Sequence, residues 1–194
     1  VATLAGVVNT ELVGTMLRAG ARAVGLSLGD GHIVRAAKAT RFAFDPGHVG
    51  DVTSGDPALV RTLLGAGFFP VVSSVALDAQ GKPLNVNADD AAAALAKVLR
   101  ARALVLLTDV PGIKDKSSQV IPEVDPARIE ALVADGTISG GMIPKARSAA
   151  RAATDSRVPV VILSGDDPAM LERFLSGQAV GTRVLPGATT EDRA

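Results

Sequence analysis

Three stretches of the sequence combine side chains that could carry chemistry. The first, LNVNADD, places two asparagines and two aspartates directly before a run of alanines. Asn87 can cap a helix that begins near residue 88, and Asp89 and Asp90 in its first turn suit the positive end of the helix dipole. Capping does not explain Asn85, which lies on the same side of an extended segment as Asn87. This stretch therefore predicts a helix start, a ligand site, or both.

The second stretch, LVLLTDVPGI, is an apolar run that ends in Thr108 and Asp109 and then turns through Pro111 and Gly112. It places a carboxylate at the carboxyl end of a strand, where ligands collect in parallel α/β sheets. Taken alone, Asp109 is explained equally well as a turn cap.

The third stretch, TISGGMIPKARSAARA, places a lysine at the start of a helix. Gly140 and Gly141 allow the backbone to approach a ligand closely, and Pro144 suits the first helical position. Lys145 then lies in the first turn, where the helix dipole disfavours a cation. A bound phosphate would reverse that penalty. Phosphoryl transfer needs such a lysine, because its catalysis consists mostly of positioning and charge neutralisation.

Composition argues against several other classes of function. The 194 residues are 47% hydrophobic, and 20 Lys and Arg balance 20 Asp and Glu, so we expect neither a nucleic-acid partner nor a membrane partner. The chain has no cysteine, which excludes thiolate metal sites, and its two histidines, His32 and His48, are too few for a multi-histidine metal cage. P-loop, dinucleotide-binding and nucleophile-elbow patterns are missing. The expected partner is a small molecule.

The elements that must position these stretches alternate between helices and apolar strands, which predicts an α/β fold with a mostly parallel sheet. Expected helices cover residues 3–19, 56–67, 88–100, 125–135, 144–155 and 167–176, and expected strands cover residues 21–28, 68–77, 103–110, 158–163 and 181–185. Residues 32–55 are expected to form a hairpin or two short strands with a glycine-rich loop.

We expect two lobes, divided at the polar turn near residues 78–84. The first covers residues 1–80, the second covers residues 81–187, and residues 188–194 form a polar, flexible tail. The opening VATLAGVVNTELV is typical of a helix interior, so we expect the sequence to begin partway through a longer protein.

The motifs NVNADDAAAALA, LLTDVPGI, GTISGGMIPKARSA and GTRV, together with AVGLSLGDG and GHVGDV, resemble the amino acid kinase family and, within it, the N-acetylglutamate kinases. The resemblance covers residues 4–185. It implies a three-layer α-β-α sandwich whose first lobe binds substrate and dimerises and whose second lobe binds nucleotide. It also implies that the family's N-terminal strand, with a lysine and a glycine pair, a glycine-rich loop and a substrate-binding arginine would lie upstream of Val1.

The resemblance implies ATP-dependent phosphorylation of the side-chain carboxylate of N-acetyl-L-glutamate, a cytoplasmic step of arginine biosynthesis, with Mg²⁺ on the phosphates. Asp89 and Lys145 would be catalytic: Asp89 would hold catalytic lysines by hydrogen bonds, and Lys145 would neutralise the phosphoryl group in transit. Asn85 would bind the substrate. The implied nucleotide-binding residues are Asp109, Val110, Pro111, Gly112, Ile113, Lys114, Thr137, Ile138 and Ser139. The resemblance assigns no protein ligand to a metal.

The resemblance further implies a homodimer or larger homo-oligomer and feedback inhibition by arginine. Two alternatives stay open. One is a truncated, non-catalytic nucleotide-binding or regulatory protein. The other is the acyl-aminoadipate kinase of lysine biosynthesis, which usually differs in the two residues before the aspartate.

Overall fold

The computed structural model describes residues 1–187. The expected tail at residues 188–194 lies outside the described residues. The chain divides into two compact units between Leu99 and Arg100, and each unit is described by itself. The first unit contains two sheets, and the second contains one.

In the first unit, the N-terminal helix combines a π-helical segment with a regular α-helix and packs on the strand pair β1–β4. These two strands are parallel. A second sheet has the order β3-β2-β5-β6 and joins β2 and β5 in parallel and its other neighbours antiparallel. The elements are η1 (Ala2–Val8), α1 (Asn9–Arg18), β1 (Ala23–Ser27), η2 (Asp30–His32), β2 (Arg35–Lys38), β3 (Gly50–Ser54), α2 (Ala58–Gly65), β4 (Phe69–Ser73), β5 (Val75–Leu77), β6 (Pro83–Asn85) and α3 (Ala88–Leu99).

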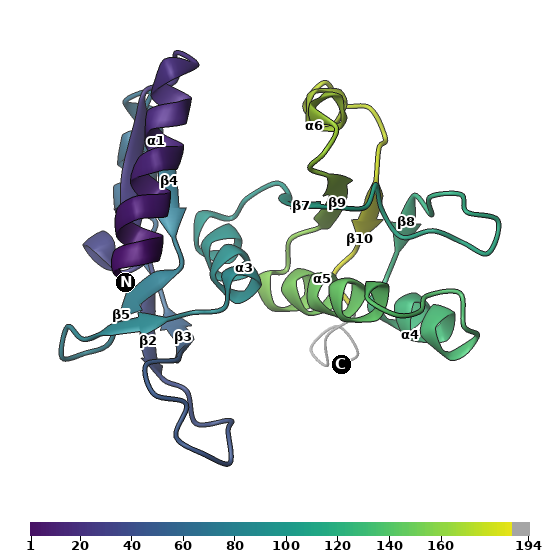
Figure 1. The fold of residues 1–194 in the computed structure, drawn as a ribbon, viewed down its shortest axis with the longest axis horizontal. Coiled ribbons are helices and arrows are strands. Elements are labelled where there is room, and N and C mark those ends of the chain that lie inside the picture. Colours follow the sequence, from purple (N-terminus) through teal and green to yellow (C-terminus); the bar gives the residue numbers. More distant parts are fainter. Residues whose placement is uncertain (188–194) are drawn as a thin grey trace. The chain divides into compact units, whose positions relative to one another are not determined.

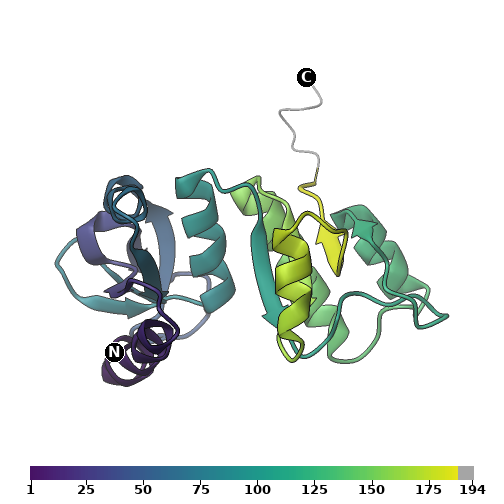
Figure 2. The same cartoon turned by 90° about the horizontal axis from the view of Figure 1, so that it is seen from above.

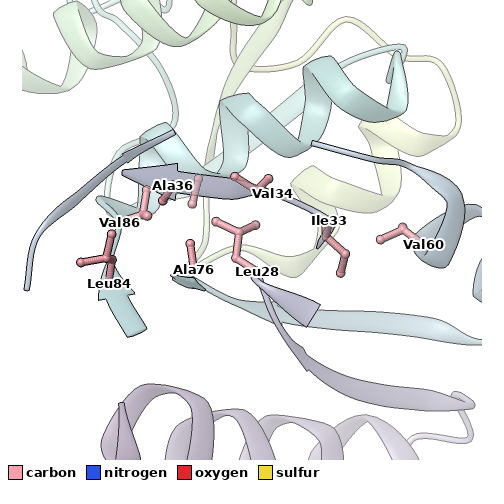
Figure 3. Packing of buried hydrophobic residues seen from close by; sticks show 9 residues of the cluster. Leu28, Ile33, Val34, Ala36, Val60, Ala76, Leu84 and Val86 are labelled. Atoms are coloured by element: carbon pink, nitrogen blue, oxygen red, sulfur yellow. The ribbon is translucent and has the colours of Figure 1, made fainter. Parts of the chain in front are cut away.

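A cluster of aliphatic side chains holds the second sheet against α3 and the end of β1. Figure 3 shows Leu28 and Ala76 at its centre, with Leu84 and Val86 on one side and Ile33 on the other. All five of these side chains are buried. Burial of Leu84 and Val86 on either side of exposed Asn85 fixes the register of the segment that leads into α3.

In the second unit, the sheet has the order β7-β9-β10-β8. Its β7–β9 and β8–β10 pairs are parallel, and β9–β10 is antiparallel. Figure 1 shows these strands between α6 and α5, and Figure 2, viewed from above, shows α6 crossing in front of them. The elements are β7 (Leu104–Thr108), β8 (Glu123–Val124), α4 (Pro126–Ala134), α5 (Met142–Ser156), β9 (Val160–Ser164), α6 (Pro168–Leu175) and β10 (Thr182–Val184).

The structure confirms the expected α/β class, with a mixed sheet system in which four of the seven strand pairings are parallel. Residues 32–55 form the antiparallel hairpin β2–β3. The expected strand at residues 68–77 is instead two strands in different sheets, because Ser74 separates β4 from β5.

The two compact units divide between Leu99 and Arg100, whereas the polar turn predicted a lobe boundary at residues 80–81. The polar turn at that boundary joins β5 to β6, and these strands pair with each other. Helix α5 begins at Met142, so Pro144 occupies its third position rather than its first. Proline is tolerated there because the first amides of a helix have no intrahelical partner. None of the helices within residues 1–187 has the length and hydropathy that a membrane-spanning segment requires.

Candidate functional site

The start of α3 has the capping geometry that its sequence predicts. The side-chain Oδ1 of Asn87 accepts hydrogen bonds from the backbone amides of Asp89 at 2.9 Å and Asp90 at 3.2 Å. Both aspartates lie in the first turn, where negative charge is favoured. The helix-start interpretation is therefore confirmed, and any catalytic role of Asp89 stays a prediction.

Asn85 ends β6 at a junction of two segments. Its backbone amide donates to the carbonyl of His48 at 2.7 Å, and an isolated bridge pairs Asn85 with Val49. Asn85 is itself exposed, whereas Leu84 and Val86 beside it are buried. Backbone pairing thus fixes a side chain that is open to solvent, which is the placement a substrate-binding residue needs.

Asp109 follows β7 in a turn that Thr108 organises. The Thr108 hydroxyl donates to the carbonyl of Val110 at 3.0 Å, and the amide of Val110 returns a hydrogen bond to the hydroxyl at 3.2 Å. The Asp109 side chain is 71% exposed. The carboxylate therefore lies at the carboxyl end of β7, as predicted, in an open position.

Lys145 lies in the first turn of α5 and forms a hydrogen-bonded ion pair with Asp109. Hydrogen bonding from the Lys145 ammonium, and next its positive charge, lower the pKa of the Asp109 carboxyl. Helix α5 has no side-chain cap at Gly141 and no acidic residue in its first turn. Asp109 therefore supplies the countercharge to a cation that its own helix disfavours.

The segment that precedes α5 is held by a turn. The side chain of Asp135 accepts hydrogen bonds from the Thr137 amide at 2.9 Å and the Thr137 hydroxyl at 2.5 Å. These hydrogen bonds lower the pKa of the Asp135 carboxyl. Ile138 is buried, and the carbonyl of Ser139 accepts from the amide of Met142 at the start of the helix. The predicted residues Thr137–Ser139 thus lead directly into the helix that carries Lys145.

Within the segment Asp109–Lys114, Gly112 and Ile113 are buried and Lys114 is exposed. The fully buried hydroxyl of Thr182 accepts from the amide of Ile113 at 2.8 Å. The sequence predicts no separate role for Thr182, which lies in the motif GTRV. The available signal was its position after a glycine at the start of an expected strand. A threonine that is buried there needs hydrogen-bond partners for its hydroxyl.

The predicted site residues are divided between the two units. Asn85 and Asp89 belong to the first, whereas Asp109–Lys114, Thr137–Ser139 and Lys145 belong to the second. The structure joins Asp109 to Lys145 within the second unit. Across residues 1–187, His, Asp and Glu side chains form no group of three that could hold a metal ion.

Comparison with known proteins assigns the class. The model of the amino acid kinase family matches residues 2–164, and the chain belongs to this family. It is 44% identical to the acetylglutamate kinase of Bradyrhizobium sp. (strain ORS 278), and the match covers 93% of this chain and 64% of that relative. The chain thus spans 64% of the length of the curated relatives that it matches.

Solved structures show the same fold. The crystal structure of smu.665 from Streptococcus mutans UA159 matches with a TM-score of 0.71 at 26% identity, covering 96% of this chain and 70% of that one. Carbamate kinase from Giardia lamblia matches with a TM-score of 0.64 at 18% identity, covering 94% of this chain and 70% of that one. The α/β fold described above is therefore the amino acid kinase fold.

Proposed function

We propose that this chain belongs to an enzyme that uses ATP to phosphorylate the side-chain carboxylate of N-acetyl-L-glutamate, in arginine biosynthesis. The observation that carries the proposal is the position of Lys145, which is an ion-paired cation in the first turn of α5. A helix start that carries a lysine suits an anionic phosphoryl group. Identity of 44% to acetylglutamate kinases supports the choice of substrate.

In the proposed reaction, a side-chain carboxylate oxygen attacks the γ-phosphorus of ATP. The new bond joins that oxygen to phosphorus, and the broken bond joins the γ-phosphorus to the oxygen that leaves with ADP. No general base is needed, because the pKa of a glutamate carboxyl is about 4.3 and the group is ionised at neutral pH. The protein's task is to position two anions and neutralise their charge.

Each predicted residue has a place in this scheme. Lys145 neutralises charge on the phosphoryl group in transit, and Asp109–Lys114 with Thr137–Ser139 bind the nucleotide. Asn85, exposed at the end of β6, binds N-acetylglutamate. Asp89, in the capped first turn of α3, organises the charged groups of the reaction.

The residues present fit Mg²⁺ that is held mainly by the nucleotide. Mg²⁺ commonly uses substrate phosphates with one or two carboxylates and needs no dedicated cage of protein ligands. When bound, Mg²⁺ would neutralise charge on the phosphates of ATP.

The proposal extends to the state of the protein in the cell. We expect a cytoplasmic homo-oligomer that arginine inhibits. Exposed apolar side chains along η1 and α1 support self-association, because an apolar surface of this kind commonly marks an interface. These side chains are Leu4, Val7, Val8, Leu12 and Leu17.

An acceptor comparison tests the proposal. The chain is incubated with MgATP and hydroxylamine, which traps acyl phosphates, and with N-acetylglutamate, the corresponding acyl-aminoadipate, or no acceptor. We expect hydroxamate only with N-acetylglutamate. Preference for the longer acceptor would instead support the lysine-pathway enzyme. Absence of hydroxamate with intact MgADP binding would contradict the kinase proposal for this chain and favour a non-catalytic nucleotide-binding protein.

A further inference from the structure

The segment Asp109–Lys114 is connected to a strand far along the chain by one side chain. The Thr182 hydroxyl accepts from the amide of Ile113 at 2.8 Å and donates to the carbonyl of Ile121 at 2.7 Å. Thr182 is 0% exposed. Its hydroxyl acts as donor and acceptor at once, which valine, a side chain of the same shape, cannot do.

These contacts close the base of a loop. The amide of Ile121 donates to the carbonyl of Ile113 at 2.8 Å, and an isolated antiparallel bridge joins Lys114 to Val120. The Thr182 hydroxyl thus bonds to both sides of the loop base, at residues 113 and 121. Strand β10, which begins at Thr182, pairs with both β9 and β8. The loop base is therefore fixed to the centre of the sheet.

Gly112 adds a steric restriction at the same point. Its φ is +152°, and a Cβ built at this position would lie 2.7 Å from Thr182 Oγ1 and 3.1 Å from the Thr182 amide nitrogen. Only glycine allows the backbone to come this close. Backbone and hydroxyl are thus packed against each other in a single arrangement.

We propose that Thr182 is a positioning residue for nucleotide binding, which fixes Gly112 and Ile113 so that the segment Asp109–Lys114 is preformed before the ligand arrives. This inference rests on the proposed function, since that function makes the segment part of the nucleotide site. Preforming a loop raises affinity because the ordering cost is not incurred on binding. Thr182→Val would keep the shape of the side chain but leave the buried Ile113 amide without this acceptor and the half-buried Ile121 carbonyl without this donor.

Two variants and a matched control test the proposal. Thr182→Val removes the hydroxyl, Thr182→Ser retains it, and Ser156→Ala removes another buried hydroxyl at the last residue of α5. The Ser156 hydroxyl donates to the Ala152 carbonyl at 2.6 Å and accepts from the Val158 amide at 3.1 Å. Calorimetric titration with MgADP measures affinity, and hydrogen exchange measures amide protection of residues 112–121 without any ligand.

We expect Thr182→Val to weaken MgADP binding about tenfold and to speed exchange at residues 112–121, because loosely held binding groups lose much of their contribution. Thr182→Ser should bind MgADP within about twofold of the unaltered chain, and Ser156→Ala should do the same even if its melting temperature falls equally. Unchanged exchange and affinity in Thr182→Val, or equal affinity losses in Thr182→Val and Ser156→Ala, would overturn the role of Thr182. Failure of the unaltered chain to bind MgADP would instead overturn the proposed function from which this role follows.

Discussion

The two helices that carry the predicted catalytic residues begin in opposite ways. At α3, the Asn87 side chain caps two amides, and two aspartates occupy the turn that favours negative charge. At α5, Gly141 provides no side-chain cap, and the first turn carries Lys145. A carboxylate 36 residues away, Asp109, compensates that lysine.

The difference shows which helix start carries independent evidence of function. The Asn87 cap and the helix dipole account for a helix start of this composition at α3, so the catalytic role of Asp89 depends on the likeness to acetylglutamate kinases. The start of α5 opposes local preference and needs a long-range ion pair. Conflicts between local preference and structure are expected mainly at functional or strained sites. The arrangement around Lys145 is therefore the stronger support for phosphoryl transfer.

The largest effect expected at the start of α3 separates two neighbouring aspartates. Asp89→Asn and Asp90→Asn remove the same charge from the same helix turn, so each loses a similar dipole contribution of about 0.3–1 kcal/mol. Asp89→Asn should also lower the hydroxamate rate by about 100-fold, because it removes a preorganised catalytic charge. Asp90→Asn should stay within about fivefold. Equal hydroxamate rates for the two variants would show that Asp89 contributes only to the start of the helix.

A smaller effect is expected at α5. Asp109→Asn deprives Lys145 of its ionic partner, and we expect kcat to fall about tenfold because the ammonium is less precisely placed. Glu130→Gln is the matched control, since it breaks the exposed ion pair of Glu130 with Arg147 in the same unit. Steady-state kinetics with varied ATP measures both variants. A rise in KM for ATP with unchanged kcat would show that Asp109 contacts nucleotide without positioning Lys145.

The capping difference also predicts a change in stability. Asn87→Ala should lower the free energy of unfolding by about 1 kcal/mol, because two amides lose their side-chain acceptor. Gly141→Ala should raise it by about 0.5 kcal/mol, since φ is −65° and no atom lies within 4 Å of the added Cβ. Urea unfolding followed by circular dichroism measures both changes. A neutral Asn87→Ala variant would contradict the capping account of α3.

The smallest effect concerns pH. The pKa of Asp109 is lowered in the folded chain by its hydrogen bond with Lys145. Its contribution to stability is therefore present above the unfolded pKa of about 3.9 and is lost as the pH falls through the lower folded pKa. The melting temperatures of the unaltered chain and Asp109→Asn should differ slightly at neutral pH, because the pair is exposed, and should converge in acid. A difference in melting temperature that persists at pH 2 would show that it does not arise from the charge of Asp109.

Much of the fold follows from local sequence signals. Asn87 identified the start of α3, and the apolar runs identified β7 and β9 to within about two residues. Very short strands give no signal of this kind: β8 has only two residues, which is too few to show a period. The polar turn after β5 suggested a lobe boundary, whereas strand pairing keeps β6 in the first unit.

For the candidate site, the sequence predicts residue types at element ends but not which ones meet. Asp109 and Lys145 were both selected, yet their ion pair depends on the parallel pairing of β7 with β9 and on the packing of α5. Thr182 was not selected, because its hydrogen bonds to Ile113 and Ile121 join residues 69 and 61 positions apart. Such contacts depend on tertiary structure, which local patterns do not encode.

The measurement that tests the central claim most directly compares Lys145→Ala with Lys116→Ala in the hydroxamate assay with MgATP and N-acetylglutamate. Lys116 is an exposed lysine of the same unit, and it pairs with Asp135 at 3.8 Å. We predict that Lys145→Ala lowers kcat by about 100-fold or more, through loss of a charge at the phosphoryl group, while Lys116→Ala retains the rate of the unaltered chain. Retention of the full rate by Lys145→Ala would contradict the assignment of phosphoryl transfer to the start of α5.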